Sequence, residues 1–323
     1  MCTAISYKTK DHYFGRNLDL EYHYNETVTI TPRNYPFQFR CAGELNSHYA
    51  MIGMAVVENG YPLYYEATNE TGLSIAGLNF PGNAFYFPPK DGKDNIAPFE
   101  LIPWLLGKCK DVTEAREIIE NINITNIPYS PKYPLSPLHW IVADKNSSVV
   151  VEQTESGLHI YDNKIGVLTN NPPFPYHLYN LQNYLNVTSA EPTNRFAESV
   201  ELLPYSRGMG GIGLPGDLSS SSRFVKAAFT KLNSQSSDGE SESVSQFFHI
   251  LDSVAQQRGC AQVGDDYEIT LYSSCCNTDT GTYYYKTYEN SQITAIRMRN
   301  ADIDGNRVLT FPMVTEQQIR YEN

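Results

Sequence analysis

The sequence lacks several features that would assign it to a common class at once. It contains no run of about 18 apolar residues, so it offers no candidate for a transmembrane helix. No positively charged start followed by an apolar stretch precedes Cys2, so we expect neither a secretory signal nor lipoprotein processing. Only six cysteines occur, and none forms a Cys-x-x-Cys pair. This sparse use predicts free thiols in a reducing compartment, and hence a cytoplasmic protein.

Basic residues are also few compared with acidic ones. The 24 lysines and arginines face 36 acidic residues, which gives a net charge of -12. A field of this sign repels nucleic acid and anionic membranes, so we expect neither as a partner. The seven histidines show no metal-ligand spacing, and "GMGGIG" at 208–213 lacks the strand and helix that flank a phosphate-binding loop. We interpret these glycines as a flexible loop near the substrate pocket.

The composition is otherwise that of a globular protein that can bury a large core. Hydrophobic residues make up 41% of the chain and charged residues 19%, and 24 tyrosines favour strands. Strands are predicted at 3–9, 13–17, 27–31, 48–57, 61–68, 73–80, 138–145, 147–154, 157–162, 164–170, 267–275, 281–288 and 291–299. Helices are predicted at 98–109, 111–122, 176–185, 223–232 and 243–257, with Asp111 as an N-cap.

Strands and helices come in groups along the chain and do not alternate one by one. This order favours antiparallel sheets with helices packed outside them, rather than βαβ units and a parallel sheet. We found no internal repeat and no convincing linker. The sequence therefore predicts one α+β domain that spans residues 1–323.

The first 22 residues, "MCTAISYKTKDHYFGRNLDLEY", place a cysteine directly behind the initiator methionine. The first two predicted strands form a hairpin around the turn "KDH" at 10–12. Cross-strand partners then have residue numbers that sum to about 21 or 22, which places Cys2 opposite Asp19 or Leu20. Diagonal neighbours in such a pair are only ~7–8 Å apart, so Arg16 also comes within reach of the first residues.

This arrangement can support nucleophilic chemistry. Arg16 can favour a thiolate, and Asp19 can orient an α-ammonium. Removal of Met1 would leave the thiol and a free α-amine on one carbon, as in enzymes with N-terminal nucleophiles. The plainer interpretation is a solvated Arg16–Asp19 pair on a strand edge, with a cysteine that only happens to follow the initiator. Physical reasoning alone leaves both interpretations open.

The same stretch resembles the start of the choloylglycine hydrolase family, which comprises bile salt hydrolases and penicillin V acylases. The resemblance continues, in order, through "NETGLSIAGLNFPG", "PLHWIVADKNSSVVVEQTESGLHIYDNKIGVLTNNPPF", "GLPGDLSSSSRF", "FFHILDSVA" and "YYYKTYENSQITAI". It therefore covers essentially the whole chain. The resemblance implies the N-terminal nucleophile hydrolase fold, with four layers in the order α-β-β-α, and a homotetramer.

The resemblance also implies the site. Cys2 becomes the nucleophile after removal of Met1, Arg16 and Asp19 tune its thiol and amine, and Asn79, Asn170 and Arg223 complete the catalytic set. Asn79 and Asn170 each close a strand-like run and are the expected donors to an oxyanion. Substrate-binding residues are expected at Leu18, Tyr129 and Tyr133. No cofactor is implied.

The implied reaction is hydrolysis of a glycine- or taurine-conjugated bile salt. Asn79 favours this substrate, since penicillin V acylases of the family often carry tyrosine at that position. Penicillin V and other linear amides remain an alternative, and a non-catalytic bile acid binding protein is a more remote one. Outside the site, His139 and Trp140 are expected in the core, and Cys275 and Cys276 in the terminal sheet. The aromatic segment 172–187 is expected in the core or, preferably, at a subunit interface.

Overall fold

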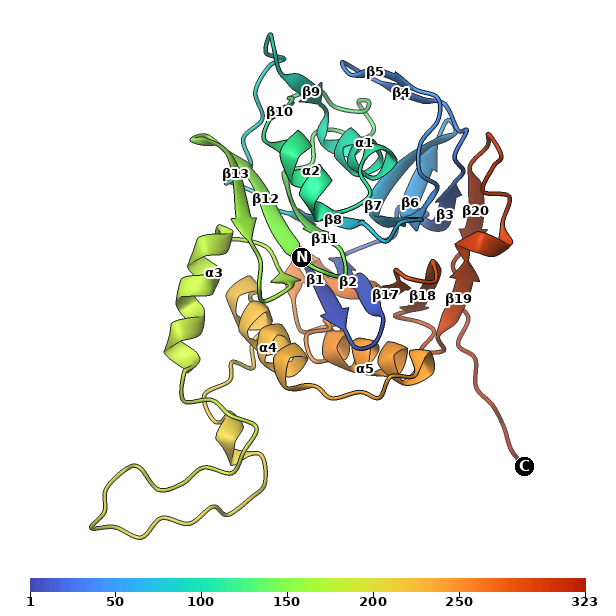
Figure 1. The fold of residues 1–323 in the computed structure, drawn as a ribbon. Coiled ribbons are helices and arrows are strands. Elements are labelled where there is room, and N and C mark those ends of the chain that lie inside the picture. Colours follow the sequence, from blue (N-terminus) through green and yellow to red (C-terminus); the bar gives the residue numbers. More distant parts are fainter.

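The computed structural model describes all residues 1–323, which form two large antiparallel sheets stacked face to face (Figure 1). The six-stranded sheet has the order β14 (Val167–Leu168), β1 (Cys2–Lys8), β2 (His12–Leu20), β17 (Ile269–Asn277), β18 (Thr282–Thr287) and β19 (Thr294–Arg297). The eight-stranded sheet has the order β13 (Gly157–Asp162), β12 (Ser148–Thr154), β11 (Leu138–Ala143), β8 (Ser74–Asn79), β7 (Tyr61–Asn69), β6 (Met51–Glu58), β3 (Thr27–Thr31) and β20 (Leu309–Pro312).

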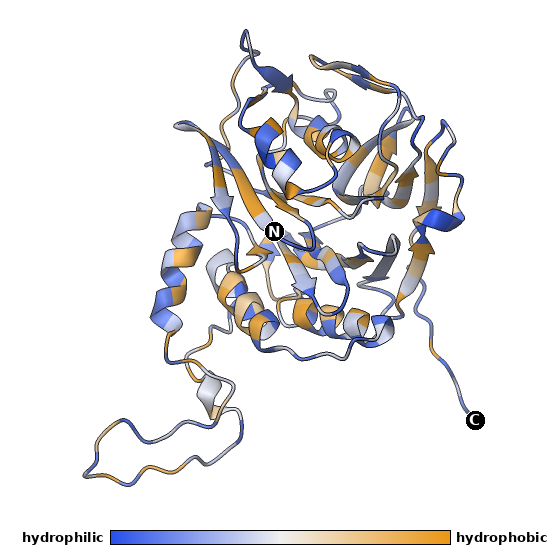
Figure 2. Ribbon diagram, viewed as in Figure 1, coloured by the Kyte–Doolittle hydropathy of each residue, from blue (hydrophilic) through white to orange (hydrophobic).

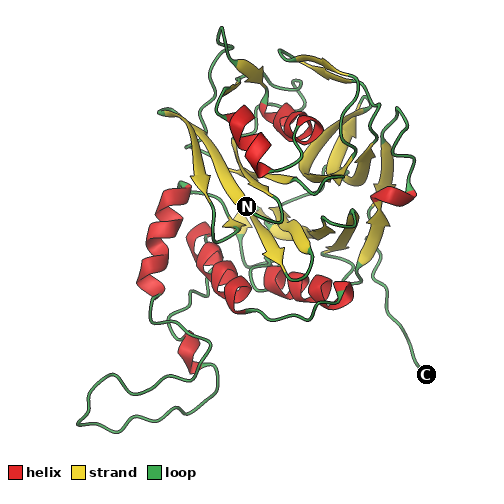
Figure 3. Cartoon of the chain, in the orientation of Figure 1, coloured by secondary structure: helices red, strands yellow, loops and turns green.

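Helices cover the outer faces of both sheets (Figure 3). The α-helices are α1 (Leu101–Lys108), α2 (Val112–Ile119), α3 (Phe174–Asn180), α4 (Ser220–Asn233) and α5 (Glu240–Asp252). Helix α1 packs on β7 and β8, whereas α4 packs on β1 and β14, and α5 on β2 and β17. The predicted four-layer α-β-β-α fold is confirmed. None of these helices combines the length and the apolar character needed to cross a bilayer.

Smaller elements decorate this frame. Three two-stranded pieces are β4 (Phe37–Phe39) with β5 (Gly43–Leu45), β9 (Asp94–Ile96) with β10 (Ile122–Ile124), and β15 (Gln262–Val263) with β16 (Asp266–Tyr267). Short 3₁₀ turns are η1 (Pro98–Glu100), η2 (Leu181–Tyr184), η3 (Met209–Gly211) and η4 (Met298–Asn300).

Two apolar cores follow from the alternation of side chains along the strands. One core lies between the sheets and under α4 and α5, and it contains Leu18, Ile141 and Phe247. The other lies between the eight-stranded sheet and helices α1 and α2, and it contains Trp104 and Trp140. Figure 2 shows the hydrophobic residues of the helices and strands gathered toward these interfaces. As predicted, His139, Trp140, Cys275 and Cys276 are all buried.

The structure corrects several predicted element boundaries. The helix predicted at 111–122 ends at Ile119, because Ile122–Ile124 forms β10 beside β9. Its N-cap is confirmed, since the Asp111 side chain accepts a hydrogen bond from the Glu114 nitrogen at 3.0 Å. The helix predicted at 243–257 runs instead from Glu240 to Asp252.

The prediction that the glycine-rich segment lies near the substrate pocket is also wrong. Gly208–Gly213 lies in a long loop that projects away from the body between α3 and α4, and it does not line the pocket described below (Figure 1).

Candidate active site

Cys2 opens β1, the second strand of the six-stranded sheet, but the predicted hairpin register was wrong. Cys2 lies opposite Leu18, and Lys8 lies opposite His12. The turn consists of residues 9–11 and is closed by a hydrogen bond from the Thr9 nitrogen to the Asp11 oxygen at 3.0 Å. His12 therefore already belongs to β2, and this moves every cross-strand partner by one or two positions.

Arg16 and Asp19 lie on opposite faces of β2, because side chains alternate along a strand. The observed register, with Cys2 opposite Leu18, puts Cys2 on the face of Arg16. Arg16 shares the inner face of the sheet with Cys2 and Leu18, whereas Asp19 lies on the face toward the helices. Gly15 makes this placement possible: a Cβ there would meet the Ser274 carbonyl oxygen at 2.0 Å, so only glycine lets β17 come this close. The nucleophile candidate thus has the arginine on one side and the carboxylate on the other.

Arg16 is 1% exposed, and its guanidinium is anchored on the eight-stranded sheet. Its Nη1 donates to the Gly77 oxygen at 2.5 Å and to the Tyr65 oxygen at 3.2 Å. Burial alone would lower the pKa of Arg16, but the negative charge of Cys2, with those of neighbouring groups, raises it. Arg16 is therefore a permanent buried cation beside Cys2.

Asp19 is completely buried, with one carboxylate oxygen held and one free. Its Oδ1 accepts a hydrogen bond from Thr270 Oγ1 at 2.6 Å, and its Oδ2 has no partner. Burial raises the pKa of Asp19, although Arg223 and the chain amine act in the opposite direction. An unpartnered carboxylate oxygen next to the chain terminus is suited to receive an α-ammonium group.

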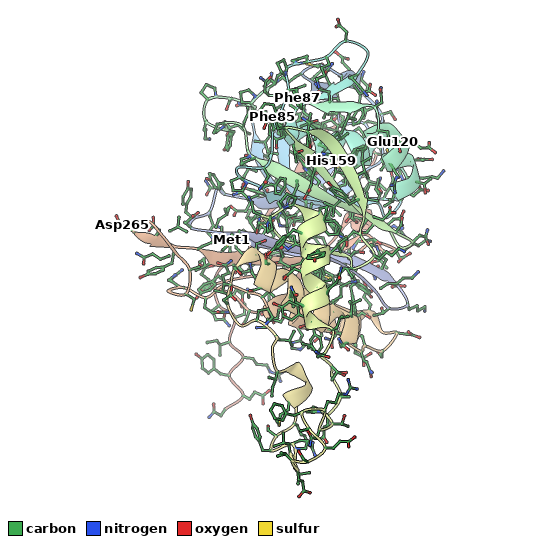
Figure 4. The ribbon with its side chains drawn as sticks, turned by 90° about the vertical axis from the view of Figure 1, so that its left-hand side faces the viewer. Met1, Phe85, Phe87, Glu120, His159 and Asp265 are labelled. Carbon is green, nitrogen blue, oxygen red and sulfur yellow. The ribbon has the colours of Figure 1, made fainter.

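Met1 is present in the structure, so the nitrogen of Cys2 is a peptide nitrogen here. The Met1 amine donates to the Asp19 backbone oxygen at 2.6 Å and forms an ion pair with Glu268. Burial lowers the pKa of this amine, and the charges of Cys2 and Asp19 oppose that effect. Figure 4 shows Met1 on the side from which the β15–β16 hairpin, with Asp265 at its turn, projects.

Asn170 connects the predicted site residues to one another. Its Oδ1 accepts hydrogen bonds from the Cys2 nitrogen and from Arg223 Nη2, both at 2.8 Å. Its Nδ2 donates to the Asn79 oxygen at 2.7 Å, which leaves the second hydrogen of that amide free. Arg223, at the start of α4, also donates through Nη1 to the Cys2 oxygen at 2.5 Å and to Thr3 Oγ1 at 2.7 Å.

The segment that carries Asn170 is held by residues that the sequence did not single out for this role. His139 Nε2 bonds the Thr169 oxygen and His177 Nε2 bonds the Asn170 oxygen, both at 2.9 Å. The Asn170 nitrogen donates to Ser220 Oγ at 2.8 Å. These residues are buried and far apart in the sequence, so only the fold reveals that they fix one asparagine.

Asn79 ends β8 and differs from Asn170 in that its side chain makes no hydrogen bond within the protein. It lines a cavity of about 330 Å³ together with Cys2 and Arg16. The walls are mainly apolar, with 16 hydrophobic residues among 24, and they include the three predicted substrate-binding residues Leu18, Tyr129 and Tyr133. The structure therefore brings Cys2, Arg16, Asn79 and these three residues to one pocket. Asp19, Asn170 and Arg223 do not line it, but Asn170 adjoins it through its hydrogen bond to the Asn79 oxygen.

The pocket is closed on one side by the loop 126–136, in which three residues hydrogen-bond to Glu58. Glu58 Oε2, at the end of β6, accepts hydrogen bonds from Lys132 Nζ at 2.9 Å and from Tyr133 Oη at 3.2 Å. Tyr129 Oη donates to the Glu58 backbone oxygen at 2.9 Å. No group of three or more His, Cys, Asp or Glu side chains forms a metal-binding cluster.

A family profile described as linear amide C–N hydrolases, choloylglycine hydrolase family, matches residues 2–311. The chain is 56% identical over 319 residues to a bile salt hydrolase/transferase of Lactiplantibacillus plantarum, with 98% of each protein covered.

Two solved structures share the fold. A mutant of the conjugated bile acid hydrolase from Clostridium perfringens is 38% identical and superposes with a TM-score of 0.92 over all of both chains. The penicillin V acylase from Agrobacterium tumefaciens superposes with a TM-score of 0.75 at 18% identity, over 96% of this chain and 90% of that one. The second similarity shows a common fold only.

Proposed function

The chain belongs to the linear amide C–N hydrolases of the choloylglycine hydrolase family, and from this we propose that it hydrolyses conjugated bile salts. The protein is then a bile salt hydrolase that releases a free bile acid and glycine or taurine. The observation that carries the proposal is the position of Cys2, which lies in the wall of a large apolar pocket beside a buried arginine. An apolar pocket binds a steroid, and the cysteine meets the amide at its end.

The proposed reaction is acyl transfer through Cys2. Removal of Met1 frees the α-amine of Cys2, which takes up the thiol proton as the sulfur attacks the amide carbon. The amine then passes this proton to the leaving nitrogen, the C–N bond breaks, and the amino acid departs while the bile acid remains on Cys2 as a thioester. Water, deprotonated by the same amine, attacks the thioester and releases the bile acid.

The other site residues have supporting roles in this proposal. Arg16 stabilises the thiolate, and the free Oδ2 of Asp19 holds the α-ammonium. Asn79, whose amide is unbonded, donates to the oxyanion, and the free hydrogen of the Asn170 amide adds a second donor. Arg223 and the Asn170 oxygen fix the backbone of Cys2.

Penicillin V is the competing substrate, since tyrosine walls accept a phenoxy group as well as a steroid. Product analysis with glycocholate, taurocholate and penicillin V, side by side, distinguishes the two. We expect at least tenfold higher kcat/KM for one of the bile salts, a ratio that corresponds to only about 1.4 kcal/mol of transition-state binding. Faster cleavage of penicillin V would assign the protein to the acylases. Bile salt binding without any product would identify a binding protein.

Acyl transfer to an amine is a second candidate activity of the same site. The relative from Lactiplantibacillus plantarum is described as a hydrolase/transferase, and a thioester on Cys2 can react with an amine in place of water. Incubation of the enzyme with cholate conjugates and an excess of a free amino acid should then give the new conjugate. Formation of cholate alone would restrict the protein to hydrolysis.

We also propose a homotetramer in the cytoplasm. The loop between α3 and α4 projects from the body (Figure 1). It carries large apolar side chains that are exposed and that a second copy of the chain can bury. Leu185, Phe196 and Tyr205 are each at least 84% exposed. All six cysteines are unpaired, which fits a reducing compartment. Light scattering should give four times the 36.5 kDa chain mass, and a monomer would contradict the assembly.

A further inference from the structure

A carboxylate is buried between the two sheets, directly behind the pocket. Glu66, on the inner face of β7, is 2% exposed. Its Oε1 accepts hydrogen bonds from Tyr283 Oη at 2.6 Å and Ser274 Oγ at 3.0 Å, and its Oε2 accepts one from Tyr272 Oη at 2.8 Å. The donors come from β17 and β18, so the carboxylate of one sheet is held by hydroxyl groups of the other.

Arg16 connects this carboxylate to the pocket. Its Nε lies 4.0 Å from Glu66 Oε2, and both groups are almost completely inaccessible to water. Arg16 also lines the pocket together with Cys2, its diagonal neighbour across the β1–β2 hairpin. A single guanidinium therefore has an anion on the side of the second sheet and the nucleophile on the pocket side.

We propose that Glu66 is a positioning residue that acts on Cys2 through Arg16, because its carboxylate shares the guanidinium charge with the thiolate. This inference rests on the proposed role of Cys2 as the nucleophile. Burying a carboxylate and a guanidinium is costly, and an apolar pair of similar shape would often stabilise a core equally well. Here the negative charge of Glu66 limits how strongly Arg16 attracts the Cys2 thiolate, so that the sulfur remains nucleophilic.

The alternative is that Glu66 only satisfies buried hydroxyl groups. That role predicts a loss of stability on substitution but no effect on the reactivity of Cys2. Titratable and charged groups other than Glu66 also surround the pair and must stay constant in any comparison. Those beside Arg16 and Glu66 are Tyr65, Tyr272, Tyr283 and Cys276, and those beside Cys2 are Asp19, Arg223 and the chain amine.

The test is the pH dependence of Cys2 alkylation in Glu66→Gln. The amide keeps the size of the side chain and an acceptor oxygen, but it removes the negative charge. Iodoacetamide labelling is followed at Cys2 by peptide mass spectrometry, since Cys41 and Cys260 are exposed and will also react. We expect the midpoint of labelling to move down by roughly one pH unit, because Arg16 then interacts with the thiolate alone.

Glu100→Gln is the matched control. Glu100 is also a buried carboxylate, but it accepts hydrogen bonds from the Arg40 and Ala97 nitrogens and does not contact Arg16. In Glu100→Gln the pH midpoint of Cys2 labelling should stay at the wild-type value, even if the Tm of this variant falls. Glu66→Asp, which restores the charge, should return the midpoint most of the way.

A second variant keeps the inference testable if Glu66→Gln does not fold. Burial raises the pKa of Glu66, and the charge of Arg16 and the hydrogen bonds from Tyr283 and Tyr272 oppose that effect. Tyr272→Phe combined with Tyr283→Phe removes these two donors, so the pKa of Glu66 rises further and the carboxyl group loses its charge at a higher pH. The labelling midpoint should move in the same direction as in Glu66→Gln.

Glycocholate hydrolysis, measured in parallel, separates the two proposals. A wild-type enzyme that hydrolyses glycocholate, combined with an unchanged labelling midpoint in the Glu66 or tyrosine variants, overturns the role of Glu66 alone. Hydrolysis that persists in Cys2→Ala overturns the role of Cys2 and with it the premise of this inference.

Discussion

Asn79 ends β8 and Asn170 follows β14, but their side chains are bound differently, and this predicts different consequences of their loss. The Asn79 amide has no partner in the protein, so Asn79→Ala should leave Tm almost unchanged. Its kcat should fall by about 10²–10³, the usual effect of one lost oxyanion donor. Steady-state kinetics on glycocholate with a thermal melt of the same sample measures both.

Asn170→Ala is the informative comparison. It removes the acceptor of Cys2 and Arg223 and the donor to Asn79. We expect a comparable loss of kcat together with a destabilisation of about 2–4 kcal/mol, because buried polar groups lose their partners. Equal loss of Tm in both variants would contradict the distinction.

A residue left in front of Cys2 should block the reaction. With such a residue the nitrogen of Cys2 is an amide, which cannot accept a proton at working pH. A protein with an uncleavable N-terminal extension should fold, yet turn over glycocholate at least ~10²-fold more slowly, the low end of general-base contributions. A C-terminally tagged protein, whose intact mass shows the loss of one methionine, is the active control. Equal rates for both would remove the α-amine from the mechanism.

The sequence predicted the site residues that chemistry or family resemblance points to, but not the buried residues that position their side chains. Cys2, Arg16 and Asp19 lie in one hairpin, so their proximity follows from local pairing. Glu66 and His177 meet the site only through packing between segments that are distant in the sequence. A lone glutamate in a strand carries no signal of this kind.

At the scale of elements, the loop 126–136 closes the pocket, and the Glu58 carboxylate accepts hydrogen bonds from two of its side chains. Glu58→Gln should weaken the contacts to Lys132 and Tyr133 and so loosen the tyrosine wall. We expect KM to rise roughly twofold to fivefold with kcat unchanged, since an exposed pair contributes little and acts on binding alone. Kinetics on glycocholate tests this.

Glu114→Gln provides the control for the loop. Glu114 lies on α2, outside the pocket, and it also pairs with an exposed lysine, Lys110. It should leave KM at the wild-type value. If both variants change KM equally, the loop is not held by Glu58.

The elements themselves were predictable where the hydrophobic pattern was long and regular. The strands of residues 61–68 and 73–80 and the helix that follows Ser219 lie close to where the sequence predicts them. The short strands β10 and β20 were missed, because three or four residues give no periodicity. The hairpin register failed because the composition of a turn does not fix which residue begins the next strand.

At the scale of the whole molecule, burial of neutral histidines couples stability to pH. Burial lowers the pKa of His12 to about 4, whereas an unfolded histidine titrates near ~6.5. Between these values the unfolded chain binds more protons, so stability falls as the pH is lowered through this window. His12→Gln should abolish this contribution, which amounts to about 3 kcal/mol between pH 7 and pH 4.

Urea unfolding of wild type and variant at both pH values measures the difference. Ser6→Ala is the control, because it removes the hydroxyl that bonds His12 Nε2 at 2.9 Å but keeps the ring. It should retain most of the wild-type pH dependence. Parallel loss of stability in wild type and His12→Gln would show that His12 does not titrate in this window.

Both large sheets combine segments from the two ends of the chain, which supports our proposal of one domain over residues 1–323. Strand β2 pairs with β17, and β3 pairs with β20. Neither sheet can be cut from the chain as a contiguous piece. Limited proteolysis should therefore remove the projecting loop without releasing a stable half.

The pairing of β2 with β17 also means that the six-stranded sheet cannot be completed until late in synthesis of the chain. The partner strand leaves the ribosome more than 250 residues after the start codon has been read. At ~5–20 residues per second this leaves roughly 10–50 s in which β2 has no β17 to pair with. A processing enzyme can reach the initiator methionine during that interval, before Asp19 and Glu268 enclose its amine. Removal of Met1 would then compete with completion of the chain. Very fast synthesis would leave a fraction of molecules that are folded but inactive because they retain Met1.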